Sequence, residues 1–323
     1  MQGKALPDQS AQAPVYVGVD VCKDWLDVYF HPVGKTLRLA NDRNGLKRLK
    51  RECEGLAIAR VVMEATGKYH RQAHRSLHAV GLPVAVVNPL RSRLFAQAIG
   101  ALAKTDRIDA AMLALFGERL DPAAAPPASE AMEELQELVR ARQAAVADKT
   151  ALANRRGEAK TAFLRAEIAR RVASVERHIA RLDEGIARRV EANEALTARY
   201  RILLSIKGVG PVTAVTLLAC LEELGACSKK GAAMLTGLAP LACDSGDKNG
   251  QRHIRGGRAH VRTALYMAAV AAARSNPDLA AFYKRLIEKG KKAKVALTAV
   301  MRKLVVIANA LIKENRHWQP TRP

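Results

Sequence analysis

The chain has 323 residues, which is enough for two domains with separate cores. Lys and Arg total 53 against 31 Asp and Glu, so the net charge of +22 favours a polyanionic partner, with nucleic acid ahead of a membrane surface. No apolar run approaches the roughly 20 residues of a bilayer-spanning helix. Residues 1–14 lack the apolar region of a signal peptide, so we expect a cytoplasmic protein with no membrane partner.

Cysteines and aromatic residues exclude further classes. The five cysteines are scattered and form no CxxC pair, so neither a zinc site nor a disulfide framework is expected. Only 4% of the residues are aromatic, which argues against base stacking on a large aromatic platform.

Residues 15–30 predict two strands joined by a tight connection. Apolar residues alternate at Val15, Val17 and Val19, and alternation returns after residues 22–24. Asp20 ends the first strand. A carboxylate in a buried strand is costly unless it binds a metal or a partner, although a turn aspartate is the common alternative.

The next elements predict a mixed-sheet α/β domain. Strands that follow one another come first, and strands alternating with helices come next, which fits a ribonuclease-H-like fold. The predicted strands are residues 36–39, 58–63 (ended by Glu64) and 83–87, and the predicted helices are a short one after residue 45, then 69–80, 90–99 and 106–119.

A Pro/Ala-rich stretch, residues 121–129, predicts a linker, and a helical hairpin follows it at 130–200. Its second helix has apolar residues at steps of four and three, the pattern of a coiled-coil seam. We interpret its Arg and Lys residues as a solvated face; a dimer contact or an RNA-binding stalk is the alternative. The seam residues are Ile168, Val172, Val175, Ile179, Leu182 and Ile186.

Residues 201–221 resemble a helix-hairpin-helix motif. Lys207, Gly208 and Gly210 lie between two apolar helices, where glycines let a backbone approach a phosphate at a helix N-terminus. Some such hairpins only pack. The chain then continues with mostly helical sequence to residue 315, including an apolar helix from Val261.

Four carboxylates form the first candidate site. Asp20 and Glu64 end strands, and Asp106 and Asp109 share one face at the start of a helix. Stabilisation of the helix dipole would explain the helical pair alone. All four, converging in a ribonuclease-H-like sheet, predict a site for Mg²⁺ or Mn²⁺ that serves phosphoryl transfer.

Ser245 forms the second candidate site. It lies in a loop rich in glycine and cations, as a serine that attacks a phosphodiester would require. A serine beside glycine is otherwise an ordinary turn residue. The cations predicted to bind nucleic acid are Lys248, Arg252, Arg255 and Arg258.

Five stretches, in order and spacing, resemble the DEDD insertion-sequence transposases of the one-ten family, relatives of the Piv/MooV-type DNA invertases. They begin GVDVCKDWLDV, VVMEATGKYH, NPLRSRLFAQ, LLSIKGVGPV and GLAPLACDSG, and the resemblance covers residues 15–315. It implies a RuvC-like domain, a coiled coil and a transposase domain. It also implies an acidic tetrad at Asp20, Glu64, Asp106 and Asp109, a nucleophile at Ser245 and a structured guide RNA, the bridge RNA.

The resulting prediction is an Mg²⁺-dependent, RNA-guided DNA recombinase. It would act on donor and target DNA through a serine–DNA intermediate, as a dimer or tetramer at the nucleoid. The alternatives are a RuvC-like junction resolvase that uses water, and a non-enzymatic helix-hairpin-helix DNA-binding protein. The predicted boundaries are a loose N-terminus at 1–13, a RuvC-like domain at 14–120, the linker at 121–129, the coiled-coil hairpin at 130–200, a transposase domain at 201–315 and a tail at 316–323.

Overall fold

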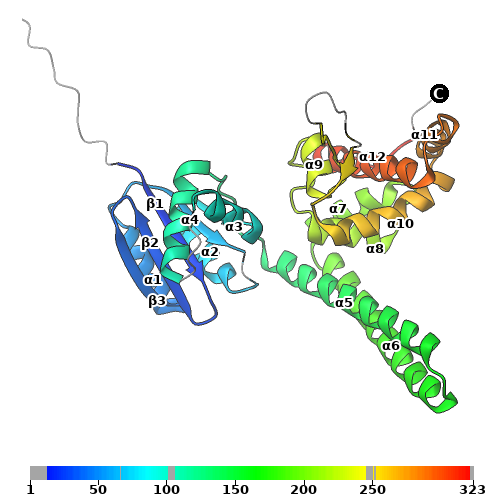
Figure 1. Cartoon of the computed structure of the whole chain (residues 1–323), viewed down its shortest axis with the longest axis horizontal. Coiled ribbons are helices and arrows are strands. Elements are labelled where there is room, and N and C mark those ends of the chain that lie inside the picture. The colour runs from blue at the N-terminus through cyan, green and yellow to red at the C-terminus, as the bar shows by residue number, and fades with distance from the viewer. Residues whose placement is uncertain (1–12, 66, 101–105, 245–249, 251, 321–323) are drawn as a thin grey trace, which may run out of the picture. The chain divides into compact units, whose positions relative to one another are not determined.

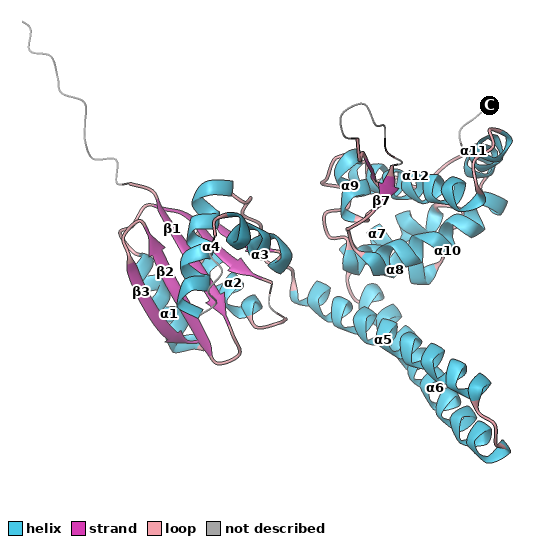
Figure 2. Cartoon of the chain, in the orientation of Figure 1, coloured by secondary structure: helices cyan, strands magenta, loops and turns pink. Residues whose placement is uncertain are grey.

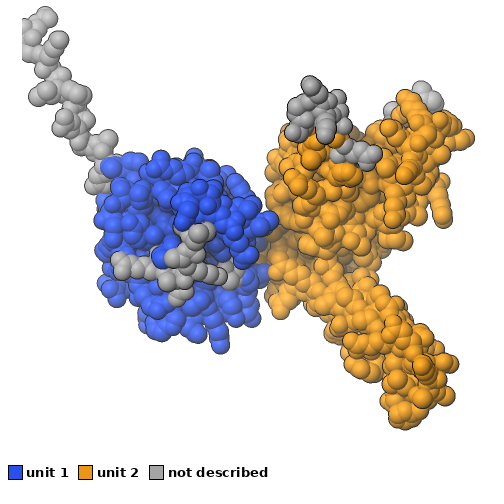
Figure 3. Space-filling model, in the orientation of Figure 1, with its two compact units in different colours: residues 1–128 blue, residues 129–323 orange. Residues whose placement is uncertain are grey.

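A computed structural model describes residues 13–65, 67–100, 106–244, 250 and 252–320, without the side chains of residues 106 and 107. The chain divides into two compact units, residues 1–128 and 129–323 (Figure 3). Strands gather in the first unit and helices dominate the second (Figure 2).

The first unit is built on a five-stranded sheet in the order β3-β2-β1-β4-β5. β1 pairs antiparallel with β2 and parallel with β4, so it is the central strand of a mixed sheet, as the sequence predicted. The strands are β1 (Val15–Val21), β2 (Trp25–His31), β3 (Lys35–Ala40), β4 (Ile58–Glu64) and β5 (Val84–Val87). The helices are α1 (Arg43–Cys53), α2 (His70–His78), α3 (Pro89–Ala98) and α4 (Asp106–Leu120).

The two faces of the sheet follow from the period of two along β1. Val17 and Val19 are fully buried in a core shared with Leu49 of α1 and Leu77 of α2. On the opposite face, Gly18 lies against α4. A second apolar cluster joins that face to α4; it consists of Val62, Val87, Met112, Leu113 and Phe116. Figure 1 shows α4 crossing the sheet on this face.

Residues 121–125, part of the stretch predicted to be a linker, are hydrogen-bonded to the rest of the first unit. Arg60 donates to the Asp121 carboxylate at 2.5 Å, and the Ala125 amide donates to the carbonyl of Val84 at 3.1 Å. The Ala125 carbonyl also lies 2.9 Å from Nε2 of His74. These bonds extend the edge of the unit beyond α4.

The second unit begins with a hairpin of two long helices, α5 (Glu130–Glu158) and α6 (Ala162–Glu191), which pack along their length. Leu152 and Ile168 are buried between them, with Val172 and Val175 packed alongside. Arg142 of α5 donates to both carboxylate oxygens of Asp183 on α6, with Nε to Oδ1 at 2.5 Å.

The rest of the second unit is a helical body with one short ladder, β6 (Pro240–Leu241) paired antiparallel with β7 (His253–Ile254). Its helices are α7 (Glu194–Ser205), α8 (Pro211–Cys220), α9 (Lys229–Leu235), α10 (Ala259–Ser275), α11 (Pro277–Glu288) and α12 (Ala293–Lys313).

The expectation that no apolar run approaches the length of a bilayer-spanning helix was wrong. α12 has 21 residues and is apolar enough, by length and composition alone, to cross a membrane. Its apolarity has a packing reason: Val300, Leu304 and Val305 are buried, and the helix contacts α7, α9, α10 and α11. α12 is therefore the central helix of this helical body.

Candidate active site

Asp20 and Glu64 come from neighbouring strands. The parallel register pairs Val19 of β1 with Met63 of β4, and Asp20 and Glu64 are the next residues on the two strands. Side chains alternate along a strand, so Asp20 shares the face of Gly18 and Glu64 shares the face of Val62. Both side chains are half-buried on the face that carries α4.

α4 brings a third predicted carboxylate to this face. A Cβ on Gly18 would overlap the carbonyl oxygen of Ala110 and would lie 2.5 Å from the amide nitrogen of Ala114, so the helix backbone lies directly on β1. Asp109 precedes Ala110 and is half-buried. Asp106 is the first residue of α4, and its side chain lies outside the described residues.

The structure adds a carboxylate that the sequence analysis missed. Asp27 of β2 lies directly opposite Asp20 in the antiparallel ladder and is 9% exposed. Arg38, opposite Asp27 on β3, donates to its Oδ2 through Nη2 at 2.9 Å. Asp27 is therefore neutralised by a cation. The sequence offered one signal for Asp27, namely its position inside the second of the two strands predicted within residues 15–30, where apolar residues alternate.

Glu64 has a different neighbour, also missed. The hydroxyl of Ser92, on α3, donates to Glu64 Oε1, and Ser92 is fully buried. Asp27 is thus held by a cation, while Glu64 is held by a neutral hydroxyl. No sequence pattern marked Ser92, because the contact joins residues of different elements.

The donor atoms are of the type that a hard divalent cation prefers, but the described side chains do not gather three of them at one point. Carboxylate oxygens from two adjacent strand ends, with a further aspartate on the covering helix, are the ligands that Mg²⁺ and Mn²⁺ prefer. Within the described side chains, which exclude that of Asp106, no three His, Cys, Asp or Glu residues form a group that could hold a metal.

The structure describes the residues on both sides of the loop that is predicted to carry the nucleophile. The β6–β7 ladder joins residues 240–241 to 253–254, and the Gly250 amide donates to Asp244 Oδ1 at 3.1 Å. These contacts bring together residues 244 and 250, which flank the segment 245–249. Ser245 and Lys248 themselves lie outside the described residues.

Three of the four cations predicted to bind nucleic acid in this loop lie within the described residues, and their contacts differ. Arg252 and Arg255 are exposed. Arg258 donates to both carboxylate oxygens of Glu223, at 2.6 and 2.7 Å. Burial raises the pKa of Glu223, but hydrogen bonds from Arg258 and from its own backbone, with the charge of Arg258, outweigh this and leave that pKa lowered. Arg258 thus has an internal partner in addition to its predicted role.

The predicted helix-hairpin-helix turn joins α7 to α8. Gly208 has φ of +102°, and a Cβ there would lie 2.5 Å from the Cβ of Ala272, so this glycine permits close packing on α10. Gly210 has open space around it and begins α8 with no side-chain cap. Lys207 is exposed. Lys207 and Gly210 are thus accessible to a ligand, while Gly208 is partly buried and has a structural role in addition to its predicted one.

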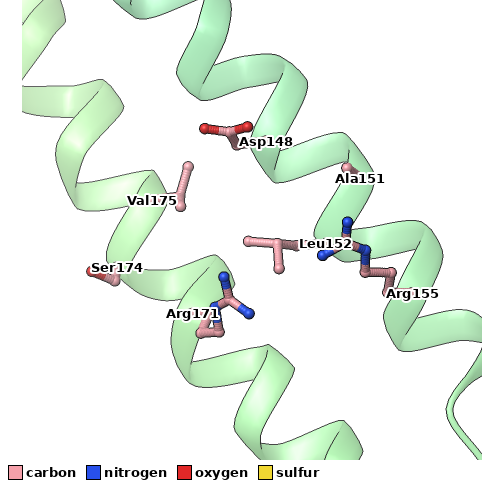
Figure 4. A pocket seen from close by; sticks show the side chains of 7 residues that line it. All are labelled: Asp148, Ala151, Leu152, Arg155, Arg171, Ser174 and Val175. Carbon is pink, nitrogen blue, oxygen red and sulfur yellow. The ribbon is translucent and has the colours of Figure 1, made fainter.

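A groove of about 340 Å³ lies on the helical hairpin (Figure 4). Its lining comes from both helices, with Leu152 of α5 and Val175 of α6 between the charged Asp148, Arg155 and Arg171. It includes none of the predicted site residues, so we do not assign it to the candidate active site.

Carboxylates on the central strands of a mixed sheet, in a strongly basic chain, are typical of enzymes that act on nucleic acids. The family model of the DEDD transposases of IS110, described as "Transposase", matches residues 17–159, and the one described as "Transposase IS116/IS110/IS902 family" matches residues 200–284. The pilin gene-inverting proteins of Moraxella bovis and Moraxella lacunata are each 28% identical over 315 residues, 93% of this chain and 96% of the relative.

The chain belongs to the IS110 family of transposases. It is therefore a DNA recombinase or transposase, and the family implies DNA as substrate and the use of a divalent metal. This assignment excludes the alternative of a non-enzymatic DNA-binding protein.

Arg258→Ala and Arg255→Ala should separate stability from binding. We expect Arg258→Ala to lower the free energy of unfolding by about 1–2 kcal/mol, since it breaks a two-bonded but partly exposed ion pair. Folding lowers the pKa of Glu223 below its ordinary 4.5, so this contribution is present above pH 4.5 and is lost as the pH falls further. Urea denaturation at pH 7 and below pH 4.5 measures it.

Arg255→Ala is the matched control, because Arg255 is exposed. It should leave the free energy of unfolding within about 0.5 kcal/mol of the wild type while weakening DNA binding. Equal stability of the two variants at pH 7 would contradict a structural role for Arg258.

Proposed function

We propose that this transposase is an Mg²⁺-dependent, RNA-guided recombinase that moves its own insertion sequence through a covalent serine–DNA intermediate. One observation carries the metal part of the proposal. Asp20 and Glu64 follow Val19 and Met63, the last pair of the parallel β1–β4 register, on the face where α4 places Asp109 next to the β1 contact at Gly18. The names of the two Moraxella relatives, pilin gene-inverting proteins, support a reaction that cuts and rejoins DNA.

Ser245 is the proposed nucleophile. Its hydroxyl loses a proton, Oγ forms a bond to the scissile phosphorus, and the bond from phosphorus to the leaving DNA oxygen breaks, so that oxygen takes up a proton. One phosphoester replaces another, so the bond energy is kept for rejoining and no ATP is required. Attack by the hydroxyl of the other DNA strand reverses the step and releases the serine.

Asp20, Glu64, Asp106 and Asp109 are the proposed ligands of Mg²⁺ or Mn²⁺. A metal held by these residues would supply positive charge to offset the charge that develops on the phosphate oxygens. The protein's part is to hold these carboxylates in place on β1, β4 and α4. The RuvC-like resolvase is the second candidate, because the same carboxylates could serve hydrolysis by water without a serine.

Sequence choice is assigned to a structured guide RNA. The charge of +22 exceeds the evident needs of one DNA duplex, and few aromatic residues are present to read bases. Lys207, Gly208, Gly210, Lys248, Arg252, Arg255 and Arg258 are the proposed nucleic-acid contacts. The working form would be a dimer, or a tetramer when two DNA sites are held together, acting at the nucleoid in the cytoplasm.

Ser245→Ala should abolish strand exchange and leave DNA binding nearly unchanged, because only the attacking oxygen is removed. A denaturing gel with end-labelled DNA should give a protein–DNA band for the wild type alone. Ser275→Ala is the matched control, since Ser275 is exposed at the end of α10. Recombination by Ser245→Ala would exclude the serine mechanism and favour the resolvase.

Asp20→Asn, Glu64→Gln, Asp106→Asn and Asp109→Asn should each reduce the rate of strand cleavage by more than about 100-fold. Each change keeps the shape of the side chain and weakens an oxygen ligand. EDTA should abolish wild-type activity, and Mg²⁺ should restore it.

Asp148→Asn provides the control for the carboxylates, because Asp148 is an exposed residue of the helical hairpin. It should match the wild type in a quantitative cleavage assay. Full wild-type activity in EDTA would mean that the four carboxylates are structural.

Protein purified with the transcripts of its own locus should carry one structured RNA, bound through backbone and shape. The bound RNA should dissociate as salt rises, because phosphate contacts dominate its affinity. Changing the loop bases of that RNA should redirect the target site, as read by sequencing the recombination junctions. Site-specific recombination by RNA-free protein would exclude the guide.

A further inference from the structure

Ser92 is a buried hydroxyl beside a proposed metal ligand. It lies in the first turn of α3 and is 0% exposed. Its Oγ donates to Glu64 Oε1 and also lies 3.0 Å from the carbonyl oxygen of Pro89. A hydroxyl has one proton to donate, so the two acceptors compete for it.

We propose that Ser92 is a positioning residue that holds the Glu64 carboxylate in its metal-binding orientation. This inference rests on the proposed function, since the role of Glu64 as a ligand is part of that proposal. Ser92 acts through Glu64 and does not itself contact the metal or the DNA.

The chemistry of the contact supports this role. An ionised carboxylate is a stronger acceptor than a peptide carbonyl, so the Ser92 proton goes to Glu64 when Glu64 is charged. The bond engages Oε1 and leaves Oε2 for a cation. A glutamate side chain has three rotatable bonds, and holding it in one rotamer removes an entropic cost from metal binding.

The surroundings of Ser92 fix its position. Asn88 caps α3 by accepting from the Leu90 amide at 2.8 Å, and Pro89 occupies the first turn. Phe95 of α3 meets Phe116 of α4 edge to face, with ring centroids 5.2 Å apart. α3 is thereby held against α4, so one packed pair of helices positions both Ser92 and the segment that contains Asp109.

A purely structural role is the competing explanation. In that case Ser92 only satisfies the Pro89 carbonyl, as serines in helices commonly do, and Glu64 finds its orientation without help. Loss of the hydroxyl would then change the stability of the chain and leave its affinity for metal unchanged.

Titration of the full chain with Mn²⁺, followed by calorimetry, separates the two explanations. For Ser92→Ala we expect Mn²⁺ affinity to fall by about 10–100-fold, the usual loss when a group that supports a metal ligand is removed. The Mg²⁺ concentration for half-maximal formation of the covalent DNA band should rise by a similar factor. At saturating Mg²⁺ the yield should return to that of the wild type, and DNA affinity should not change.

Ser92→Cys covers the case in which the alanine variant does not fold, because cysteine is close in size and is only a weak donor. The inference is supported if the Mn²⁺ dissociation constant of the folded variant is higher than that of the wild type. It is overturned if the folded variant has the same Mn²⁺ dissociation constant as the wild type. Glu64→Gln separates the two proposals. If Glu64→Gln loses Mn²⁺ affinity while Ser92→Ala keeps it, only the role of Ser92 fails; if Glu64→Gln itself binds and cleaves like the wild type, the proposed metal site fails.

Discussion

The close approach of α4 to β1 at Gly18 is the constraint on which the candidate active site depends. Any side chain at this position would enter the backbone of α4 at Ala110 and Ala114, so the helix would have to move off the strand. Asp109 adjoins Ala110, and Asp20 lies two residues beyond Gly18 on the same face. The absence of a side chain at Gly18 therefore sets the separation between the carboxylates of the strands and those of the helix.

Much of this arrangement could be predicted from sequence because its signals are local. Period-two alternation located β1 and β2, and acidic residues at strand ends marked Asp20 and Glu64. The pairs Asp27–Arg38 and Glu64–Ser92 could not be predicted, since they depend on strand register and on where α3 packs. The apolar run of α12 was overlooked for a different reason: Arg302 and Lys303 interrupt it, and it reaches the length of a bilayer-spanning helix only when these two cations are included.

In the second unit, the pattern of charges in the sequence likewise does not reveal contacts between residues that are distant along the chain. Arg252, Arg255 and Arg258 look equivalent along the chain, but Arg258 donates to Glu223, an acid that lies 35 residues earlier. A basic loop therefore contains two kinds of arginine, one that fixes the fold of the loop's base and others that face solvent. The glycines of the α7–α8 turn divide similarly, with Gly208 packed on α10 and Gly210 open.

The different partners of Asp27 and Glu64 bear on how a phosphate can reach the acidic site. Arg38 places a positive charge beside Asp27, whereas Ser92 supplies only a neutral hydroxyl to Glu64. A phosphate about 4 Å from one such carboxylate is repelled by roughly 4 kcal/mol at the effective dielectric constant of a protein surface. The net charge of +22 attracts DNA to the chain as a whole but does not remove this local repulsion. A divalent cation held by these carboxylates would turn this repulsion into attraction, so the charge arrangement itself favours a metal-dependent reaction.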